Sequence, residues 1–424
     1  MINYFITKSF LEGEIIIPPS KSQTMRAILF GSLSNGNSII KNFLSSKDTI
    51  SFIEGCENFN AKIDVFENIL NIQGTNQKIN LKKNKILDVN NSGIALRFLT
   101  SIYSLGNEKI IIRGDSSIEN NRSLKPLIET LEDLNVEFQF FKKNNFAPLS
   151  IKGPIFKKNE ISILGYDSQY VSSILIALSL FNDDFILKVE DPNEKPFVDM
   201  TLSWLKKFNL DITNQNYKKF IIKKGFSIEA FEYSVPTDFS TLLFVVVAAL
   251  ITKSEITIKN VVFDEDQKDF LVLDILKNFG ANIDINKDTI VVKKSILTGS
   301  KIVDINDYID ALPILSVFGC FVDSLTLINA KNAKHKESNR IFAITKELRK
   351  MNANIIETED GVIIKKSILK NSKVSSHKDH RIALSLIVAS LAISGTTEVQ
   401  DIECIDKTYP NFKNDFLKIG ANIL

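Results

Sequence analysis

The sequence predicts an α/β protein assembled from six copies of one unit. Two junctions predict this fold class, because both recur with a period of about 70 residues. At the first junction a helix ends at Asn or Gly and an alternating strand follows. At the second, a polar turn joins an apolar helix to a strand. A chain of 424 residues is long enough for two domains, so three units per domain are expected.

Each unit contains a helix that we expect to end at Asn or Gly. These two residues tolerate the left-handed backbone conformation that closes a helix. The alternation of apolar and polar residues that follows is typical of a half-buried strand. The six predicted helix ends are Asn60, Asn135, Asn209, Gly280, Asn352 and Gly420. The strands after the second junction begin near Asn37, Glu108, Asp184, Glu255, Ser324 and Thr397.

A short polar cluster opens an apolar helix in every unit. Helix capping explains Ser, Asp and Asn at such positions. A helix start also offers free N–H groups and the positive end of the helix dipole, so several converging starts would bind an anion. Lys21, Gln169, His380 and Arg381 go beyond what capping requires. The clusters begin at Ser20, Asn91, Asp167, Thr237, Asp310 and Asp379.

Arginine is rare, since only seven of the 52 basic residues are Arg. Its planar fork holds a carboxylate or phosphate by two parallel hydrogen bonds, so the retained arginines indicate oxyanion sites. Arg113 and Arg349 are interpreted as surface charge. Lys336 and Arg340 are predicted to share one face of a helix, where Glu337 and Arg340 would form an i,i+3 pair. Arg26, Arg97 and Arg381 lie at polar clusters. Arg122 lies in a loop before another helix, and Arg340 closes the run that begins at Lys336.

Composition excludes several classes of protein. A net charge of +2 argues against a nucleic-acid partner. Three scattered cysteines indicate a reducing cytoplasm and argue against a disulfide or zinc framework, and three histidines cannot build a His-rich metal site. The longest apolar run, Leu242–Ile251, is too short to span a membrane and predicts a buried helix.

Six segments together resemble the motifs of the 5-enolpyruvylshikimate-3-phosphate synthase family of enolpyruvyl transferases. The segments are Pro18–Arg26, Asn91–Arg97, Asp310–Ala311, Asn332–Arg340, Asp379–Arg381 and Lys407–Pro410. The resemblance implies the enolpyruvyl-transferase fold, an inside-out α/β barrel with two domains of three βαβαββ repeats. We expect one lobe from residues 1–17 plus 236–424, which would hold the phosphoenolpyruvate carboxylate and the catalytic residues. The other, residues 18–235, would bind shikimate 3-phosphate, with the active site in the cleft between them.

The resemblance also implies a reaction of the shikimate pathway. The 5-hydroxyl of shikimate 3-phosphate adds to the central carbon of phosphoenolpyruvate while the methylene carbon is protonated, and the tetrahedral intermediate then loses phosphate. Neither a metal nor an organic cofactor is implied. A monomer in the cytoplasm, with no nucleic-acid or membrane partner, is expected.

Residue roles follow from the resemblance alone. Asp310 would act on the acceptor hydroxyl and Glu337 would protonate the methylene carbon, with Lys21, His380 and Lys407 nearby. Arg340 and Arg381 would bind the carboxylate of phosphoenolpyruvate. Its phosphate would be held by Lys21, Gly93, Arg122, Gln169 and Lys407. The residues expected to bind shikimate 3-phosphate are Lys21, Ser22, Arg26, Asp167, Ser168, Gln169, Glu194, Asp310, Asn332 and Lys336.

Two of these positions depart from the family's usual pattern. Asp167 and Glu194 stand where serines usually help to bind the shikimate phosphate, and two carboxylates there would repel it. Lys195 or Lys336 would have to compensate, or the acidic side chains would have to turn away. Another hydroxyl acceptor and an inactive anion-binding homologue therefore stay open as alternatives. The sister transferase that acts on a UDP-amino sugar fits less well, because the 113–122 loop contains no cysteine.

Overall fold

The computed structural model describes residues 2–82, 85–155, 158, 160–181, 183–225 and 227–424. The chain forms two compact units. Unit 1 consists of Met1–Pro18 and Pro236–Leu424, and unit 2 consists of Pro19–Val235. Each unit has its own hydrophobic core. Both places where the chain passes from one unit to the other contain a proline.

Six four-stranded sheets formed by the described residues, three in each unit, confirm the six predicted repeats. One repeat illustrates the plan, with strand order β10-β11-β13-β12. β10 runs parallel to β11, and the other neighbouring pairs are antiparallel. This is the βαβαββ connectivity expected. Its elements are β10 (Glu160–Leu164), α6 (Ser168–Ser179), β11 (Phe185–Glu190), α7 (Lys195–Lys207), β12 (Ile212–Gln215) and β13 (Lys219–Ile222).

Unit 2 contains two further repeats of this plan, with strand orders β14-β3-β5-β4 and β6-β7-β9-β8. The first is built from α1 (Lys21–Leu33), β3 (Asn37–Lys41), α2 (Lys47–Glu57), β4 (Lys62–Phe66), β5 (Ile69–Gln73) and β14 (Glu232–Ser234). The second is built from β6 (Ile86–Asp88), α3 (Gly93–Tyr103), β7 (Ile110–Arg113), α4 (Ser116–Asn120), α5 (Lys125–Glu132), β8 (Glu137–Phe140) and β9 (Leu149–Lys152).

Unit 1 contains three repeats, with strand orders β16-β17-β15-β2, β18-β19-β21-β20 and β22-β23-β1-β24. The first has β2 (Glu12–Ile16), α8 (Phe239–Ile251), β15 (Glu255–Lys259), η1 (Lys268–Leu271), α9 (Val272–Lys277), β16 (Asn282–Ile285) and β17 (Ile290–Lys293). The second has β18 (Ser300–Asp304), η2 (Asn306–Ala311), α10 (Leu312–Gly319), β19 (Ser324–Ile328), η3 (Lys331–His335), α11 (Arg340–Lys350), β20 (Asn354–Glu357) and β21 (Val362–Lys365). The third has β22 (Lys373–Ser375), α12 (His380–Leu391), β23 (Thr396–Gln400), η4 (Ile402–Lys407), α13 (Phe412–Lys418), β24 (Asn422–Ile423) and β1 (Tyr4–Thr7).

The repeats are interlaced along the chain. In unit 2, the last strand, β14, pairs with β3 of the first repeat. In unit 1, the N-terminal strands do the same: β2 pairs with β15, and β1 lies between β23 and β24. Each unit is therefore closed by strands from opposite ends of its own sequence.

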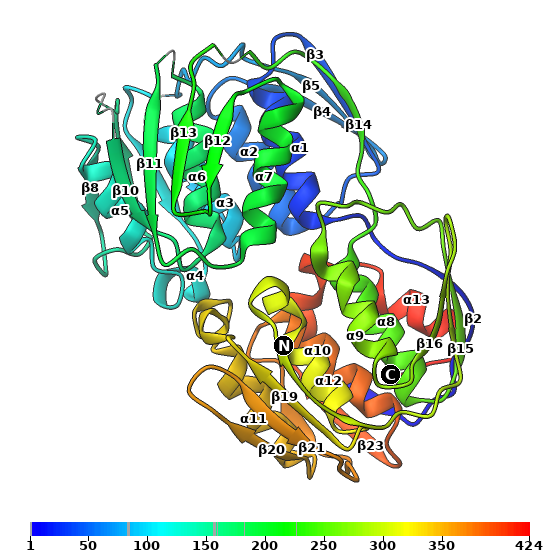
Figure 1. Ribbon diagram of the computed structural model, residues 1–424. Helices are drawn as coiled ribbons and strands as arrows, with labels where there is room; N and C mark the ends of the chain where they lie inside the picture. The colour runs from blue at the N-terminus through cyan, green and yellow to red at the C-terminus, as the bar shows by residue number, and fades with distance from the viewer. Residues whose placement is uncertain (1, 83–84, 156–157, 159, 182, 226) are drawn as a thin grey trace. The chain divides into compact units, whose positions relative to one another are not determined.

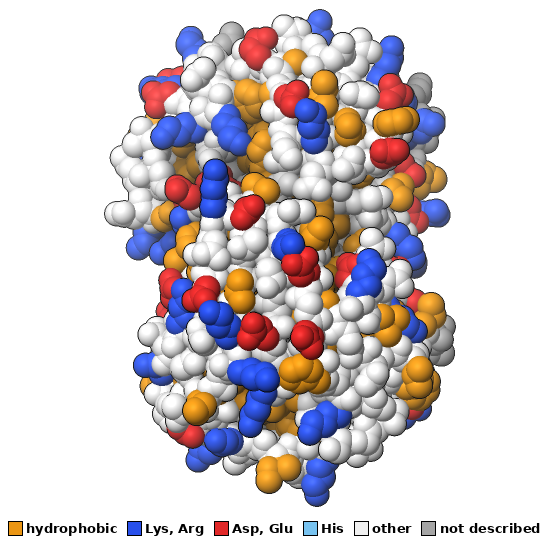
Figure 2. All heavy atoms as spheres, turned by 90° about the vertical axis from the view of Figure 1, so that its right-hand side faces the viewer, with side chains coloured by type: hydrophobic (Ala, Val, Ile, Leu, Met, Phe, Trp, Pro, Cys, Tyr) orange, Lys and Arg blue, Asp and Glu red, His pale blue; other side chains and the backbone are white. Residues whose placement is uncertain are grey.

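The apolar helices lie inside and the sheets lie outside. In unit 1, α8, α10 and α12 pack against one another, as Figure 1 shows. Helix α8 is buried on nearly all sides, which explains the apolar run at Leu242–Ile251. Among the described residues, no helix is long and apolar enough to cross a bilayer. On the face of each unit shown in Figure 2, basic side chains are interspersed with acidic ones.

The last helix of every repeat ends as the sequence predicts. All six end residues have positive φ, from 60° at Asn209 to 93° at Gly420. At Gly280 the backbone N–H bonds to Lys277 O, and the next N–H, at Ala281, reaches back to Leu276 O. This pattern satisfies the free carbonyls at the helix end. It turns the chain directly into the hairpin that follows.

The first helix of each repeat begins at the predicted polar cluster, and in five repeats a residue of that cluster is the N-cap. The capping side chains belong to Ser20, Ser92, Asp167, Asp238 and Asp379. Asp310 is the exception. It lies in the short 3-10 helix before α10 and makes no capping hydrogen bond. Its carboxylate is available for side-chain partners instead.

Candidate active site

Arg340 is the centre of a buried ion-pair network in unit 1. It is the first residue of α11, and its side chain is only 1 % exposed. Its Nη1 donates to Asp310 Oδ1 at 2.6 Å and its Nη2 to Glu337 Oε2 at 2.7 Å. Its Nε donates to Asp379 Oδ2 at 2.8 Å. One guanidinium therefore joins three carboxylates that come from three segments of the chain.

Asp310 is held by a second guanidinium as well. Arg381 Nη2, on the first turn of α12, donates to Asp310 Oδ2 at 2.6 Å. Burial alone would raise the pKa of Asp310, but Arg381, Arg340 and Lys336 hold it well below its usual range. Among the described residues, no atom accepts a hydrogen bond from the buried Arg381 Nε. Arg340 and Arg381 thus both donate to the Asp310 carboxylate, while the Nε donor of Arg381 has no acceptor among the described residues.

Glu337 lies between two cations. Its Oε2 accepts from Arg340, and its Oε1 accepts from Lys407 Nζ at 2.9 Å. The side chains of Glu337 and Lys407 are 6 % and 7 % exposed, so this is not a surface salt bridge. The prediction that Lys336–Arg340 is helical is wrong, because Asn339 is the N-cap of α11 and the helix begins at Arg340. The non-helical backbone before the cap turns Glu337 inward.

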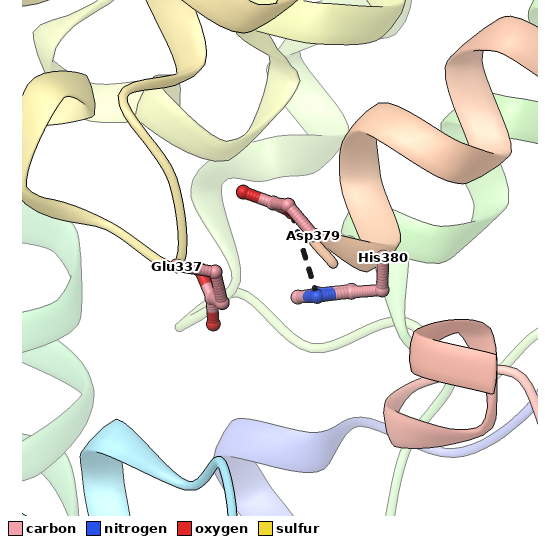
Figure 3. A group of neighbouring side chains, drawn as sticks. All are labelled: Glu337, Asp379 and His380. Carbon is pink, nitrogen blue, oxygen red and sulfur yellow. Dashed lines mark ion pairs between the residues drawn. The ribbon is translucent and has the colours of Figure 1, made fainter. Parts of the chain in front are cut away.

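Asp379 ties the start of α12 to this network. Its Oδ1 caps the helix by accepting from Arg381 N at 2.9 Å, and its Oδ2 accepts from Ser338 Oγ at 3.1 Å as well as from Arg340. His380 is buried, with Nδ1 3.7 Å from Asp379 Oδ1, and Figure 3 shows it with Asp379 and Glu337.

Glu337, Asp379 and His380 are close enough to hold a metal ion. However, both carboxylates already accept hydrogen bonds from Arg340, and Lys407 also donates to Glu337. A further cation would meet two positive charges at these oxygens. The group fits an ion-pair network better than a metal centre.

Asn332 and Lys336, two predicted ligands of the acceptor, are also buried in unit 1. Asn332 lies in η3, and none of the described residues accepts a hydrogen bond from its Nδ2. Lys336 follows this 3-10 helix, and its positive charge contributes to the low pKa of Asp310. The segment 332–340 therefore contributes Lys336, Glu337 and Arg340 to the charged network, and Asn332 is buried in the same segment.

Unit 2 has a second polar cluster, centred on Arg97 of α3. Arg97 Nη1 donates to Gln169 Oε1 at 2.9 Å, and Nη2 lies 3.3 Å from Asp167 Oδ2. Burial would lower the pKa of Arg97, but Asp167 and Tyr170 raise it. A side chain at Gly93 would meet Arg97 Nη1 at 2.9 Å and Arg122 Cζ at 3.4 Å. Gly93 therefore lets two arginines approach the start of α3.

The carboxylates of Asp167 and Glu194, which stand where the family usually has serines, both have partners within unit 2. Asp167 caps α6 through Gln169 N and pairs with Arg97, which is the compensating cation that the sequence did not suggest. Glu194 Oε2 accepts from Ser168 Oγ at 2.9 Å, and Glu194 is 1 % exposed. Lys195 is exposed, with its ammonium 5.5 Å from the centre of the Tyr217 ring.

Arg26 is engaged by its own unit. Its Nε and Nη2 donate to Thr201 Oγ1, its Nη2 also to Phe197 O at 2.9 Å, and its Nη1 to Ser22 O at 3.1 Å. The guanidinium lies 5.4 Å from the centre of the Phe98 ring. Lys21 and Ser22 are half-buried in the first turn of α1. Arg26 thus joins α1 to α7.

Sequence reasoning missed three members of these clusters. Arg97 was noticed as a scarce arginine and Asp379 as a helix cap, but neither was assigned to the site. The partners of both lie far away in sequence, for example Gln169 at 72 residues from Arg97. Asp269, in η1, was not singled out. It is buried, and Asp310 contributes to raising its pKa to about 7.

The part of the chain that contains both clusters matches the model of one protein family. The family model for EPSP synthase (3-phosphoshikimate 1-carboxyvinyltransferase) matches residues 6–416. This range contains all the candidate site residues in both units.

Curated relatives match over almost the whole chain. A 3-phosphoshikimate 1-carboxyvinyltransferase of Chlamydia caviae is 38% identical over 426 residues, covering 100% of this chain and 95% of the relative. One of Chlamydia muridarum is 39% identical over 424 residues, covering 99% and 95%. The solved structure of an EPSP synthase from Acinetobacter baumannii superposes with a TM-score of 0.81 at 24% identity, covering 100% and 99% of the two chains. That structural likeness confirms the predicted fold.

Proposed function

This chain belongs to the EPSP synthase family, and on that premise we propose how its residues divide the reaction. The chain is a transferase of the shikimate pathway. It moves the carboxyvinyl group of phosphoenolpyruvate to the 5-hydroxyl of shikimate 3-phosphate and releases phosphate.

The carboxylate of phosphoenolpyruvate would bind between Arg340 and Arg381. The observation that carries this assignment is that both guanidinium groups already hold a carboxylate, that of Asp310, at 2.6 Å. A substrate carboxylate can replace it in the same geometry and use the open Nε of Arg381. Replacement would release Asp310 from two positive charges and make it a stronger base.

Asp310 and Glu337 would then divide the proton transfers. Asp310 would take the proton of the acceptor hydroxyl as its oxygen bonds to the central carbon. Glu337 would protonate the methylene carbon, with Lys407, 2.9 Å away, able to return a proton to it. His380 would lie beside the reacting carbon. For elimination, the Glu337 carboxylate would take a proton back from the new methyl group. The C–O bond to the phosphate would break at the same time, and phosphate would leave with its electron pair.

The phosphate of phosphoenolpyruvate would bind in unit 2 and that of the acceptor beside it. Lys21, Gly93, Arg122 and Gln169, with Lys407 from unit 1, are proposed for the first phosphate. Gly93 supports this assignment, because a side chain there would crowd Arg122. The proposed ligands of shikimate 3-phosphate in both units are Lys21, Ser22, Arg26, Asp167, Ser168, Gln169, Glu194, Asp310, Asn332 and Lys336.

We propose that both clusters act on one pair of substrates, which together carry two phosphates and two carboxylates. We also propose that the protein acts as a monomer, since one chain supplies every proposed ligand. A cytoplasmic location is proposed because Cys56, Cys320 and Cys404 are all free thiols.

One observation favours a second candidate, a different hydroxyl acceptor. Ser168, a predicted phosphate ligand, already donates to the buried Glu194 carboxylate. A bound phosphate would have to share that hydroxyl with a negative charge. An acceptor without this phosphate would avoid the repulsion.

Phosphate release from phosphoenolpyruvate tests these proposals. We expect release by the wild-type protein with shikimate 3-phosphate and none without it. Arg340→Lys loses the fork and should lower kcat/KM by about 100-fold or more. Arg113→Lys, at an exposed ion pair, is the matched control and should match wild type. Release only with another hydroxyl compound would establish the second candidate, and no release with any acceptor would indicate an anion-binding homologue.

A further inference from the structure

A carboxylate outside the proposed reaction holds the turn that leads into Asp379. Glu347 lies on α11 with a side chain that is 0 % exposed. Its Oε1 is 2.8 Å from His377 Nε2, and its Oε2 accepts from Ser375 N at 3.0 Å and Lys350 Nζ at 2.7 Å. Burial raises the pKa of Glu347, but the bonds from His377, Lys350 and Ser375 outweigh it and lower the pKa to about 2. An ionised carboxylate only accepts, so His377 Nε2 carries the hydrogen.

His377 occupies a backbone conformation that it does not favour. His377 and Lys378 have φ values of 52° and 58°, and Asp379 N bonds to Ser376 O at 3.0 Å. This is a type I′ turn, which usually carries Gly, Asn or Asp at both central positions. Neither His nor Lys belongs to that group, so contacts outside the turn must maintain it.

The turn is fixed from two sides. On one side, Ser376 Oγ donates to Asp401 O at 2.7 Å and accepts from Lys378 N at 2.9 Å. On the other side, His377 reaches Glu347. The next residue after the turn is Asp379, which binds Arg340, and Arg381 lies two residues further on.

A displacement of this turn would therefore move both Asp379, which binds Arg340, and Arg381, which binds Asp310. Asp379 is the N-cap of α12 and accepts from Arg340 Nε at 2.8 Å. Arg381 is on the first turn of the same helix and donates to Asp310 at 2.6 Å. Both hydrogen bonds are short and join side chains that are largely buried, so a small shift of the turn would lengthen them.

We infer that His377 and Glu347 are positioning residues for the carboxyvinyl transfer: their hydrogen bond holds the strained turn that places Asp379 and Arg381. Neither residue touches the proposed substrates. The inference rests on the proposed function, since it assigns these two residues to the same site.

Steady-state kinetics with phosphoenolpyruvate and shikimate 3-phosphate test the inference. His377→Ala removes the donor, and Glu347→Gln removes the charge. Both variants should lower kcat about tenfold or more and raise the KM for phosphoenolpyruvate, because Arg381 is misplaced. His377→Gln keeps an N–H donor at a similar reach and should recover activity to within about threefold of wild type. The double variant should be no worse than the more impaired single variant, because both substitutions act on the same hydrogen bond.

Lys350→Met is the matched control. It removes another partner of Glu347 without touching the turn, and it should stay within about twofold of wild type. Amide hydrogen exchange at residues 376–381 gives a readout independent of turnover, and it should become faster in His377→Ala. If that variant does not fold, His377→Leu replaces it, since Leu fills similar space, disfavours the same backbone conformation and offers no hydrogen-bond donor.

The outcomes separate the two proposals. Wild-type kcat and KM in His377→Ala or its Leu replacement, or unchanged exchange at the turn, would overturn the inference while the proposed function stands. Absence of turnover by the wild-type protein would instead overturn the proposed function. Faster exchange at the turn would even then support the structural part of the inference.

Discussion

Arg340 donates hydrogen bonds to three carboxylates, and only one of them, Glu337, is its neighbour in sequence. A lysine has one ammonium group and cannot reproduce this planar arrangement. Removing the guanidinium would leave three carboxylates buried without their shared cation, which typically costs about 3–5 kcal/mol for a single broken buried pair. This explains why arginine persists here in a chain that otherwise uses lysine.

Asp310 is both the proposed base and the group that occupies the proposed carboxylate site. Asp310→Asn keeps the shape but removes the negative charge that competes for Arg340 and Arg381. We expect kcat to fall by about 100-fold or more, because the base is lost. The Kd of the variant for phosphoenolpyruvate should be equal to or lower than that of wild type, and isothermal titration calorimetry would measure it. Weaker binding would mean that the two arginines bind a different group of the substrate.

Asp269 is a buried carboxyl near Asp310, and its environment makes a prediction about pH. Burial and the negative charge of Asp310 raise its pKa to about 7, although Arg381 opposes the shift. The unfolded chain releases this proton near pH 4, whereas the folded chain keeps it until about pH 7. The native state therefore binds more protons in this range, and the contribution of Asp269 makes stability fall as pH rises.

Asp269→Asn should remove that dependence. The variant should gain stability relative to wild type between about pH 5 and pH 8, by at most a few kcal/mol. Urea unfolding at both pH values measures the difference. Asp274→Asn, in the neighbouring helix α9 and more exposed, is the control. A gain that is the same at both pH values would contradict the assignment.

The sequence revealed the residue types of the site but not their pairings. The scarcity of arginine and the motif at 332–340 pointed to Arg340. The pair between Asp167 and Arg97 joins two helices that only the packing of unit 2 brings together. The bond between Glu347 and His377 joins a helix to a strained turn, and no spacing rule connects residues 30 positions apart.

At the scale of elements, helix ends were easier to predict than helix starts. A left-handed residue at a helix end is a local steric requirement, and all six ends show it. The start of α11 was predicted wrongly because Lys336, Glu337 and Arg340 fit a helical spacing. The structure places Asn339 as the cap, accepting from Phe342 N at 3.2 Å. Asn339 caps the start of α11, so the helix begins at Arg340. The charge pattern had predicted that the helix extends back to Lys336.

Asn135 gives a test of the helix-end rule. Its φ is 62°, a conformation that Gly adopts freely and Ala does not. Asn135→Ala should lower the free energy of unfolding by about 1 kcal/mol, and Asn135→Gly should change it by less than about half of that. Chemical denaturation of the two variants would measure the difference. Equal effects would mean that the side chain, rather than the backbone conformation, matters at this position.

At the scale of the molecule, each unit depends on a strand or strands from distant parts of the chain. β1 lies inside its sheet, with β23 on one side and β24 on the other, and β2 adds an edge to another sheet. Such pairing has no local signature, so the sequence could indicate the number of repeats but not which strand completes each one.

Removal of residues 2–17 tests this dependence. The shortened chain loses one central and one edge strand from unit 1 and nothing from unit 2. Hydrogen exchange should show loss of protection in unit 1 while unit 2 keeps most of its own, since partial unfolding follows such contiguous elements. Phe5→Ala, at an exposed position of β1, is the control. Equal loss in both units would show that they unfold together.

In each repeat, the start of the first helix carries the proposed ligand-binding residues, and the end of the last helix forms the turn into the next strand. This difference has a consequence for design. The last helices end in Asn or Gly in every copy, while the first helices begin with Ser, Asn, Asp or Thr and different charged neighbours. The copies therefore differ at the ends proposed to meet ligands and are alike where backbone sterics leave little choice. New acceptor specificity could be introduced at the first helix starts without disturbing the joints that keep the repeat folded.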